Sequence, residues 1–346
     1  MGVSWPLSLV NHLSARRTGL LGLLTLGFFT LFVLPLRPAA AANLRFLLGG
    51  VAAVGPNAQP VSVSARLQDL NLTWYYDYSY QLDDEQPGTH KVAVLRGGET
   101  NRAPLDRVAD QARRHPGHYW IVFNEPDLEG QDMVSDQFLA ARGQKRFDYY
   151  AQTYHEYAVT LKQADPTAKL VAPNLFSPTG DPRPWLDGFR SAYKALYGTE
   201  PPVDVWGLHL YPFDPKWQTL PVLNIDYSKK LYATFRDYVH AIPGQANAPI
   251  WVTEAGTIWA YKDIYQGSDS LFRGNVYAWP EVTAYLADLI PWLEAQGVGR
   301  WFLFGTNPAP DPWAGVPNAL YLLDNGGQPT EAGQLLSNRL MAAQLH

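Results

Sequence analysis

The sequence predicts an α/β fold in which eight parallel strands alternate with helices and close into a (β/α)8 TIM barrel. Three observations lead to this prediction. The chain has 346 residues, a length that suits one large barrel domain. Short apolar segments alternate with longer amphipathic ones, as in parallel βαβ units. No glycine-rich dinucleotide fingerprint follows any apolar segment, which argues against a dinucleotide-binding sheet.

The predicted strands are short runs rich in Val, Trp, Tyr, Phe and Leu that are bounded by turn residues. They are residues 46–53, 72–77, 91–95, 119–124, 169–173, 205–210, 249–254 and 300–305. Because all eight lie in one domain, a closed barrel is favoured over a doubly wound sheet.

The predicted helices repeat apolar residues at three- and four-residue steps, as one buried helix face does. This pattern is clearest in residues 147–161 and 282–293, and weaker in residues 64–71, 104–114 and 184–197. Pro280 and Glu281 suit the first turn of the helix over 282–293, and Gly297 suits its end.

The N-terminal segment has the layout of a secretory signal peptide. Arg16 and Arg17 precede an apolar run over residues 19–36, and four alanines at 39–42 offer a cleavage site. The run is also nearly long enough to be an uncleaved membrane anchor. We therefore expect residues 1–42 to be a signal peptide or anchor and residues 43–346 to be the barrel domain. The domain would be extracytoplasmic, either secreted or membrane-anchored.

The composition excludes some functions and favours others. The net charge of −5 gives no basic face for nucleic acid, and the absence of cysteine removes disulfides and thiol nucleophiles. The chain has 12 Trp and 20 Tyr, a surplus that suits either a large core or the packing of flat rings on sugars.

Two predicted strands end in a carboxylate that is followed at once by strand-breaking residues. Glu125 ends the fourth strand and Glu254 the seventh. The C-terminal ends of the strands form the catalytic face of such barrels, so both side chains can point into one central space. Cleavage of a glycosidic bond needs such a pair, one carboxylic acid and one carboxylate. The alternative is that each Glu makes a salt bridge or caps the following helix.

The sequence here resembles retaining glycoside hydrolases of clan A, in which Asn-Glu-Pro ends strand four and Thr-Glu ends strand seven. The resemblance implies that Glu125 is the acid/base and Glu254 the nucleophile of a double displacement. Within the clan the chain is most similar to glycoside hydrolase family 128, whose members act on β-1,3-glucans. The matching segments are Trp74-Tyr75-Tyr76, residues 123–127, Val171-Ala172-Pro173, Val203-Asp204 and His209-Leu210-Tyr211.

Three positions depart from the family pattern. Asp77 and Tyr78 stand where the family has Asn and Trp, and Arg96 ends the third strand where an aromatic is expected. These positions would line sugar subsites, so the substrate stays open. A β-xylosidase or arabinosidase of the same clan and a non-catalytic carbohydrate-binding barrel remain as alternatives.

Further residues are candidates for binding the substrate or orienting the carboxylates. The resemblance implies that Asn124 binds the sugar 2-hydroxyl, although an Asx cap is an alternative. His209 and Tyr211 lie two residues apart, on the same side of the sixth strand, and the resemblance implies that this region orients the nucleophile. The other candidates are Asn174, Trp74, Tyr76, Arg96, Trp259, Trp301, Phe304 and the long aromatic segment over residues 257–279.

The sequence lacks the spacing of a zinc helix, a Gly-x-Ser-x-Gly elbow and a phosphate-binding loop. We therefore expect neither metal nor cofactor. We expect a monomer that acts on a carbohydrate, binds no nucleic acid and meets a membrane only through an uncleaved N-terminal anchor.

Overall fold

The computed structural model describes residues 49–52, 62–176, 181, 183–212, 223–256, 279–306, 322–324 and 326–344. The chain divides into the compact units Met1–Pro38 and Ala39–His346, and every described residue belongs to the second. In these ranges we find no helix with the length and apolar character of a membrane span. The predicted signal peptide or anchor at 1–42 lies outside the described residues, so that expectation stays a prediction.

Each predicted strand is present, and all pair in parallel. The strands are β1 (Gly49–Ala52), β2 (Trp74–Tyr75), β3 (His90–Lys91), β4 (Ala93–Leu95), β5 (Tyr119–Val122), β6 (Lys169–Val171), β7 (Trp206–Leu210), β8 (Ile250–Ala255) and β9 (Arg300–Phe304). The predicted third strand is divided into β3 and β4 at Val92. The strands form a six-stranded sheet in the order β3-β2-β1-β9-β8-β7 and a three-stranded sheet in the order β4-β5-β6.

The two sheets join into one ring of eight strand segments. On one side, β3 and β4 are consecutive parts of one extended segment that pairs first with β2 and then with β5. On the other side, Val171 and Val205 form a parallel bridge, and Ala172 N donates to Val205 O at 2.8 Å. The ring is completed where β1 pairs with β9. This arrangement agrees with the predicted TIM barrel.

The β1–β9 pairing requires glycine in β1. A Cβ atom at Gly49 would lie 2.8 Å from the Trp301 ring, and one at Gly50 would lie 2.6 Å from the Phe302 ring. Side chains on both sides of this pairing would collide, so the bulky aromatics of β9 are accommodated only because β1 has none there.

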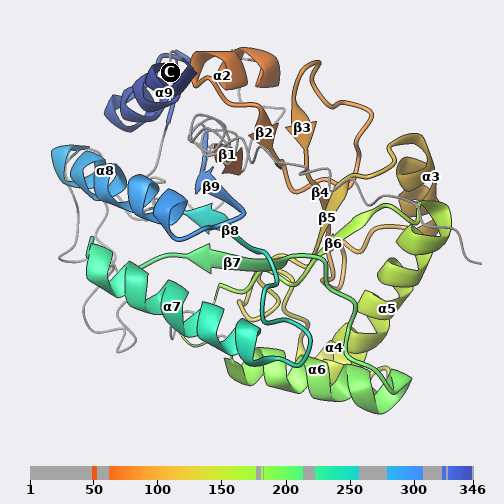
Figure 1. Cartoon of the computed structure of the whole chain (residues 1–346). Helices are drawn as coiled ribbons and strands as arrows, with labels where there is room; N and C mark the ends of the chain where they lie inside the picture. Colours follow the sequence, from red (N-terminus) through yellow and green to blue (C-terminus); the bar gives the residue numbers. More distant parts are fainter. Residues whose placement is uncertain are drawn as a thin grey trace, which may run out of the picture. The chain divides into compact units, whose positions relative to one another are not determined.

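Helices lie outside the ring of strands (Figure 1). They are α2 (Val63–Asp69), α3 (Leu105–Arg114), α4 (Asp136–Ala140), α5 (Arg146–Ala164), α6 (Arg183–Tyr197), α7 (Ile225–Ala241), α8 (Trp279–Ala295) and α9 (Glu331–Gln344). The five predicted helices correspond to α2, α3, α5, α6 and α8. The side chains of Ser62, Ser135 and Asn224 accept hydrogen bonds from the first turns of α2, α4 and α7 and so fix where these helices begin.

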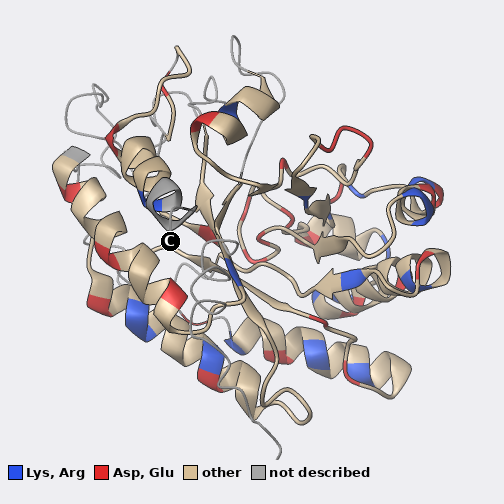
Figure 2. Cartoon of the chain, turned by 45° about the horizontal axis from the view of Figure 1, so that its top comes forward, with Lys and Arg blue, Asp and Glu red and all other residues tan. Residues whose placement is uncertain are grey.

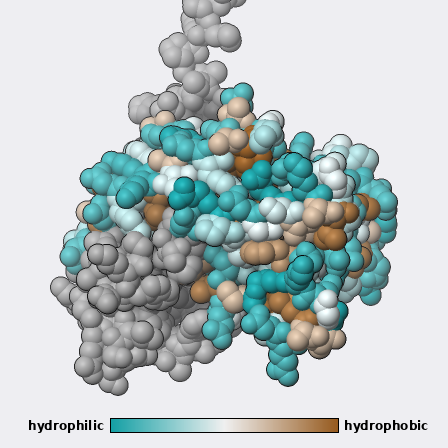
Figure 3. Space-filling model, turned by 90° about the horizontal axis from the view of Figure 1, so that it is seen from below, coloured by the Kyte–Doolittle hydropathy of each residue, from teal (hydrophilic) through white to brown (hydrophobic). Residues whose placement is uncertain are grey.

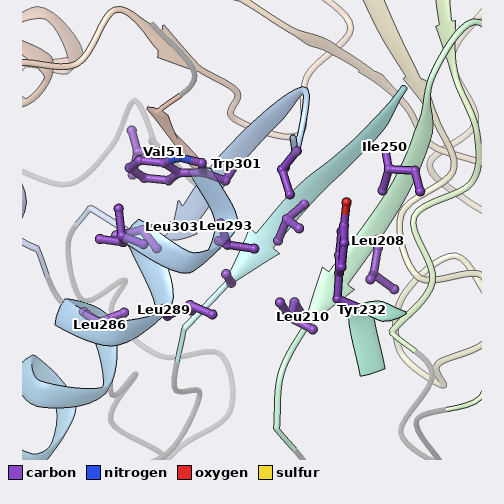
Figure 4. Packing of buried hydrophobic residues seen from close by; sticks show 14 of the residues in the cluster. Val51, Leu208, Leu210, Tyr232, Ile250, Leu286, Leu289, Leu293, Trp301 and Leu303 are labelled. Carbon is purple, nitrogen blue, oxygen red and sulfur yellow. The ribbon is translucent and has the colours of Figure 1, made fainter. Parts of the chain in front are cut away.

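The core has an inner and an outer part. Inside the ring, buried side chains from different strands pack together: Tyr76, Val92, Val94, Ile121, Val171, Val205, Trp251 and Phe302. Outside it, strand residues such as Leu208 and Leu303 meet the apolar faces of α7 and α8 (Figure 4). Each fully buried Leu or Ile contributes about 1.5–3 kcal/mol. The packing therefore holds the strand ends, and the side chains they carry, in fixed positions.

The described surface is mostly polar. Acidic and basic side chains are mixed along the outer helices in the view of Figure 2. Hydrophobic residues form small, separate groups on the face shown in Figure 3. Val159 and Leu196 are the large hydrophobic side chains exposed among the described residues.

Candidate active site

Glu125 and Glu254 lie at the C-terminal ends of the strands, as the sequence predicts. Glu125 follows β5 in a backbone that is left-handed at Phe123 (φ 72°) and at Glu125 (φ 48°). Such non-glycine residues cost about 1–3 kcal/mol each and persist where surrounding structure fixes them. Glu254 lies within β8 and pairs with His209 of β7, directly after a register shift at Leu208/His209.

These three side chains form a compact group, which we call the carboxylate cluster (Glu125, His209 and Glu254). His209 Nδ1 lies 2.8 Å from Glu125 Oε1 and 3.3 Å from Glu254 Oε2. One carboxylate oxygen of each Glu and one ring nitrogen of His209 all lie within 4.8 Å of one another. All three residues are buried, with 6 %, 3 % and 3 % of their surface exposed for Glu125, Glu254 and His209.

Three tyrosines surround Glu254. Tyr78 Oη donates to Glu254 Oε1 at 2.6 Å, and Tyr211 Oη donates to Glu254 Oε2 at 2.7 Å. Tyr76 Oη lies 3.0 Å from Glu254 Oε1 and 2.8 Å from Thr253 O, and its single proton is shared between these two acceptors. Burial, together with the charge of Glu254, raises the pKa of each tyrosine well above 10. The hydroxyls therefore keep their protons and act as donors, which stabilises the negative charge of the carboxylate.

Glu125 has a different environment. Burial raises the pKa of Glu125 to about 7, and the charges of Glu254 and Asp127 add to this effect. The hydrogen bond and charge of His209 oppose it. Burial lowers the pKa of His209, but the carboxylates of Glu254 and Glu125 raise it more, so its pKa lies above the usual 6.5. Near neutral pH the cluster therefore holds a proton that Glu125 can donate.

Asn124 is held beside Glu125 by a buried aspartate that the sequence analysis missed. Asp132 is fully buried and accepts hydrogen bonds from the backbone N–H of Asn124 at 2.8 Å and of Gly97 at 2.9 Å. Asn124 Nδ2 donates to Gln131 Oε1 at 3.3 Å, and its Oδ1 has no partner among the described residues. That oxygen remains able to accept a hydrogen bond from a ligand.

Arg96 belongs to the same network. Its Nε donates to Asp132 Oδ1 at 2.7 Å, and 20 % of its side chain is exposed. Rather than projecting as a free cation, Arg96 is held against the loop that carries Asn124. No motif in the sequence marks Asp132, because it follows Asn124 by eight residues within a loop.

Asn174 supports Glu125 chiefly through its backbone. Asn174 O accepts from Glu125 N at 2.7 Å, and Asn174 N donates to Phe123 O at 3.2 Å. Its side chain is fully buried against β7, where a Cβ on Gly207 would lie 1.9 Å from Asn174 Oδ1. The oxygen and the nitrogen of its side-chain amide have no hydrogen-bond partner among the described residues.

Two predicted sugar-stacking residues have other positions. Trp74 begins β2, at the end of the barrel opposite the carboxylate cluster, where the guanidinium of Arg300 lies 3.4 Å from its ring centroid. Tyr76 is fully buried, so its ring faces the barrel interior and its hydroxyl reaches Glu254. The alternation of side chains along a strand shows which of them share a face, but it does not show how far along the barrel each one lies. The sequence therefore does not place Trp74 and Tyr76 relative to the carboxylate cluster.

The remaining candidates divide into three groups. Trp301 is fully buried and packs in the outer core. Phe304 ends β9, is half-buried, and packs against Phe176 and Tyr211 near the carboxylate cluster. Trp259 lies outside the described residues, as does the segment over 257–278.

The spacing of Glu125, His209 and Glu254 also suits a metal ion. However, both oxygens of Glu254 already accept hydrogen bonds from tyrosine hydroxyls, and His209 Nδ1 lies between the two carboxylates. Such a group is suited to sharing and transferring protons.

The chain is similar to a known protein family and to several solved structures. Residues 50–336 match the family described as glycosyl hydrolase catalytic core. No curated protein matches the chain. Several solved structures share its fold, and three of them include both enzymes and a binding protein.

One is an endo-β-1,3-glucanase of glycoside hydrolase family 128, subgroup I, from Amycolatopsis mediterranei, in complex with laminarihexaose. Its sequence is 21 % identical to this one, the TM-score is 0.55, and the match covers 84 % of this chain and 99 % of the glucanase. A curdlan-specific exo-β-1,3-glucanase of subgroup III from Blastomyces gilchristii is 18 % identical with a TM-score of 0.51, covering 84 % and 98 %. A subgroup VII oligosaccharide-binding protein from Cryptococcus neoformans is 19 % identical with a TM-score of 0.53, covering 88 % and 97 %.

These similarities confirm the predicted fold, and the family match confirms the predicted resemblance to glycoside hydrolases. The chain is a glycoside hydrolase and belongs to the glycosyl hydrolase catalytic core family.

Proposed function

We propose that the protein is a retaining glycoside hydrolase that cleaves a β-linked glucan by double displacement. The observation that carries this proposal is the approach of Glu125 and Glu254, whose nearest carboxylate oxygens lie within 4.8 Å. Retaining enzymes hold their two carboxyl groups about 5–5.5 Å apart, whereas inverting enzymes leave about 6.5–9.5 Å for a water molecule. The close approach favours direct attack by one carboxylate.

The surroundings of each carboxylate support a division of roles. Glu125, with a pKa of about 7, is suited to donate a proton and later to accept one. Both oxygens of Glu254 accept hydrogen bonds from tyrosine hydroxyls, and Glu254 lies 3.3 Å from His209 Nδ1, so its carboxylate is held in one orientation. A fixed orientation toward the reacting carbon is what a nucleophile requires.

The proposed reaction has two steps. First, Glu254 forms a bond to the anomeric carbon while the bond to the leaving oxygen breaks, and Glu125 gives that oxygen its proton. Second, Glu125 takes a proton from water, whose oxygen attacks the anomeric carbon and releases Glu254. The β configuration is kept because the carbon is inverted twice. Asn124 Oδ1 is available to bind a sugar hydroxyl beside Glu125.

We propose β-1,3-glucan as the substrate class because two of the similar structures are described as β-1,3-glucanases. All three residues that depart from the family pattern form bonds to other residues of the chain, Arg96 to Asp132 as described above. Asp77 forms an ion pair with Lys91 at 2.7 Å, and Tyr78 binds Glu254. These positions therefore serve the framework of the site, which leaves the sugar subsites to other residues.

An oligosaccharide-binding protein is the second candidate, since one similar structure carries that description. In that case this chain would bind a glucan without cleaving it. The presence of both carboxylates in contact with His209 argues against it. Cleavage of β-xylosides or α-arabinosides by a clan A enzyme is the other alternative.

One experiment separates these functions. The purified protein is incubated with laminarin, xylan, mannan and small aryl glycosides, and the first anomer released is followed by proton NMR. Release of the β-anomer from laminarin is the expected result. Release of the α-anomer would contradict the retaining mechanism, cleavage of xylan alone would contradict the substrate, and binding without cleavage would favour the second candidate.

The apolar N-terminal segment in the sequence supports an extracytoplasmic location. We propose that the protein works outside the cytoplasm as a monomer, either free or held by residues 1–42.

A further inference from the structure

A second group of histidines and carboxylates lies at the opposite end of the barrel. His115 caps the C-terminus of α3, and His118 immediately precedes β5. Glu85 lies in the connection between β2 and β3. Glu125 follows the far end of β5, about 20 Å away at roughly 3.3 Å per residue of strand. This group is therefore separate from the carboxylate cluster.

The side chains converge on one point. His118 Nε2 lies 3.1 Å from Glu85 Oε2, and the rings of His115 and His118 are 5.6 Å apart, edge to face. One possible ligand atom from each of Glu85, His115 and His118 lies within 4.8 Å of the others. Their side chains are 20–22 % exposed, so an ion from solvent can reach them.

The backbone positions these groups independently of any ion. Gly117, between the two histidines, has φ of 80°, and its N–H donates to Asp165 Oδ2 at 2.7 Å. Glu85 Oε1 accepts from Lys91 N at 2.7 Å, which orients Glu85 Oε2 toward His118. The turn and the carboxylate are each fixed by a separate hydrogen bond. An ion that binds here therefore has to immobilise few side chains.

We propose that Glu85, His115 and His118 form a binding site for a divalent transition-metal ion, and that this ion is Zn²⁺. Two imidazoles and one carboxylate match the ligands of Zn²⁺, whereas Mg²⁺ and Ca²⁺ prefer oxygen ligands alone. Asp83 lies 3.0 Å from His115 Nε2, but its carboxylate is already bonded to Arg114 and Gln111. Water therefore completes the coordination. The ion would tie the β2–β3 connection to the turn between α3 and β5.

Isothermal titration of ZnCl₂ into the metal-stripped full chain tests this proposal. One Zn²⁺ is expected to bind per chain and to raise the thermal midpoint by several degrees, because binding to the folded state alone stabilises it. The double variant H115A/H118A should weaken binding by more than about 100-fold, beyond the 10–100-fold typical of an outer partner. Co²⁺ in place of Zn²⁺ should give visible absorption bands that the double variant lacks.

Two further variants keep the test decisive. Glu85→Gln preserves an acceptor for Lys91 N but removes the charge, so it should fold and still lose affinity. His240→Gln, on α7, removes a histidine elsewhere and should bind Zn²⁺ as the wild type does. Absence of Zn²⁺ binding by the wild type would overturn the proposal. So would binding that survives in H115A/H118A and disappears in His209→Gln, because the ion would then lie at the carboxylate cluster.

Discussion

The two ends of the barrel bury charge in opposite ways. At the carboxylate end, Glu125 and Glu254 are buried beside His209 and the tyrosine hydroxyls, so the charges are met by polar donors. At the other end, Arg300 stacks on Trp74, with its guanidinium 3.4 Å from the ring centroid, and lies 5.3 Å from the centroid of Trp251. Burial lowers the pKa of Arg300 to about 10.

This difference separates a reactive region from a structural one. Two acids crowded into a buried space hold a proton ready for transfer, at a cost in stability. A guanidinium over aromatic rings gains cation–π attraction and changes little with pH. Substitutions at the first end are therefore expected to change activity, and those at the second to change stability.

The largest effect is expected at Glu254. Replacing Glu254 with Ala removes the nucleophile and should lower kcat for laminarin by roughly 10⁴-fold or more. Azide, which can occupy the space of the lost carboxylate, should restore turnover of an aryl β-glucoside. Rates are measured by release of reducing sugar and of the aryl group. Glu129→Ala, an exposed glutamate in the loop after β5, is the matched control and should be fully active. Undiminished hydrolysis by Glu254→Ala would refute the assignment.

The next effect concerns the proton on Glu125. Since the acid acts in its protonated form and its pKa is raised to about 7, kcat/KM should fall as pH rises through about 7. Glu125→Gln should abolish this limb and slow cleavage of laminarin by about 10²–10⁴-fold. An aryl glucoside with a good leaving group should still form the glycosyl enzyme in that variant. A profile that stays flat to pH 9 in the wild type would contradict the proposed role.

A smaller effect is expected for the tyrosines. Tyr78→Phe removes a 2.6 Å hydrogen bond to Glu254, worth about 1.5–3 kcal/mol for a charged acceptor. If this bond orients the nucleophile, kcat should fall about 10- to 150-fold with little change in KM. Tyr80→Phe, two residues away, provides the control. A fall in Tm with normal kcat would instead assign Tyr78 a structural role.

The smallest effect on activity is expected at the far end of the barrel. Trp74→Ala removes the ring under Arg300 and should destabilise the fold by about 2–4 kcal/mol, since the tryptophan is half-buried. Chemical denaturation measures this loss, and kcat/KM of the folded fraction should stay within twofold. A large loss of kcat in the folded fraction would contradict the division of the barrel into a reactive end and a structural end.

Much of the fold follows from local patterns in the sequence. The barrel strands are short apolar runs with clear boundaries, so all eight are recognisable. α8 is recognisable because Pro280 and Glu281 fall in its first turn and Gly297 follows its end. In contrast, α4, α7 and α9 were not predicted, and α4 has only five residues. The buried face of α7 includes Ser228, and α9 is rich in small and polar residues, so their packing depends on the neighbouring helices.

The candidate site is predictable where it lies on strands and less so where it lies in loops. Glu125, His209, Tyr211 and Glu254 are at or just beyond strand ends, and the strand period places them together. Tyr78 reaches Glu254 through a backbone with φ of 61°, a local geometry that its sequence does not reveal. The same holds for Asp132, whose contacts depend on the path of the loop after β5.

The pairing of β1 with β9 has a consequence for how the chain is made. The two strands are separated by nearly the whole described sequence, so their pairing is a long-range contact of the kind that forms slowly. A ribosome that has just added Glu254 has made both carboxylates but not β9. The nascent chain at that moment has an open sheet edge at β1, and its unpaired backbone can join another chain. The edge at β1 thus stays open until the chain has been extended through β9, which is the last strand of the ring to be made.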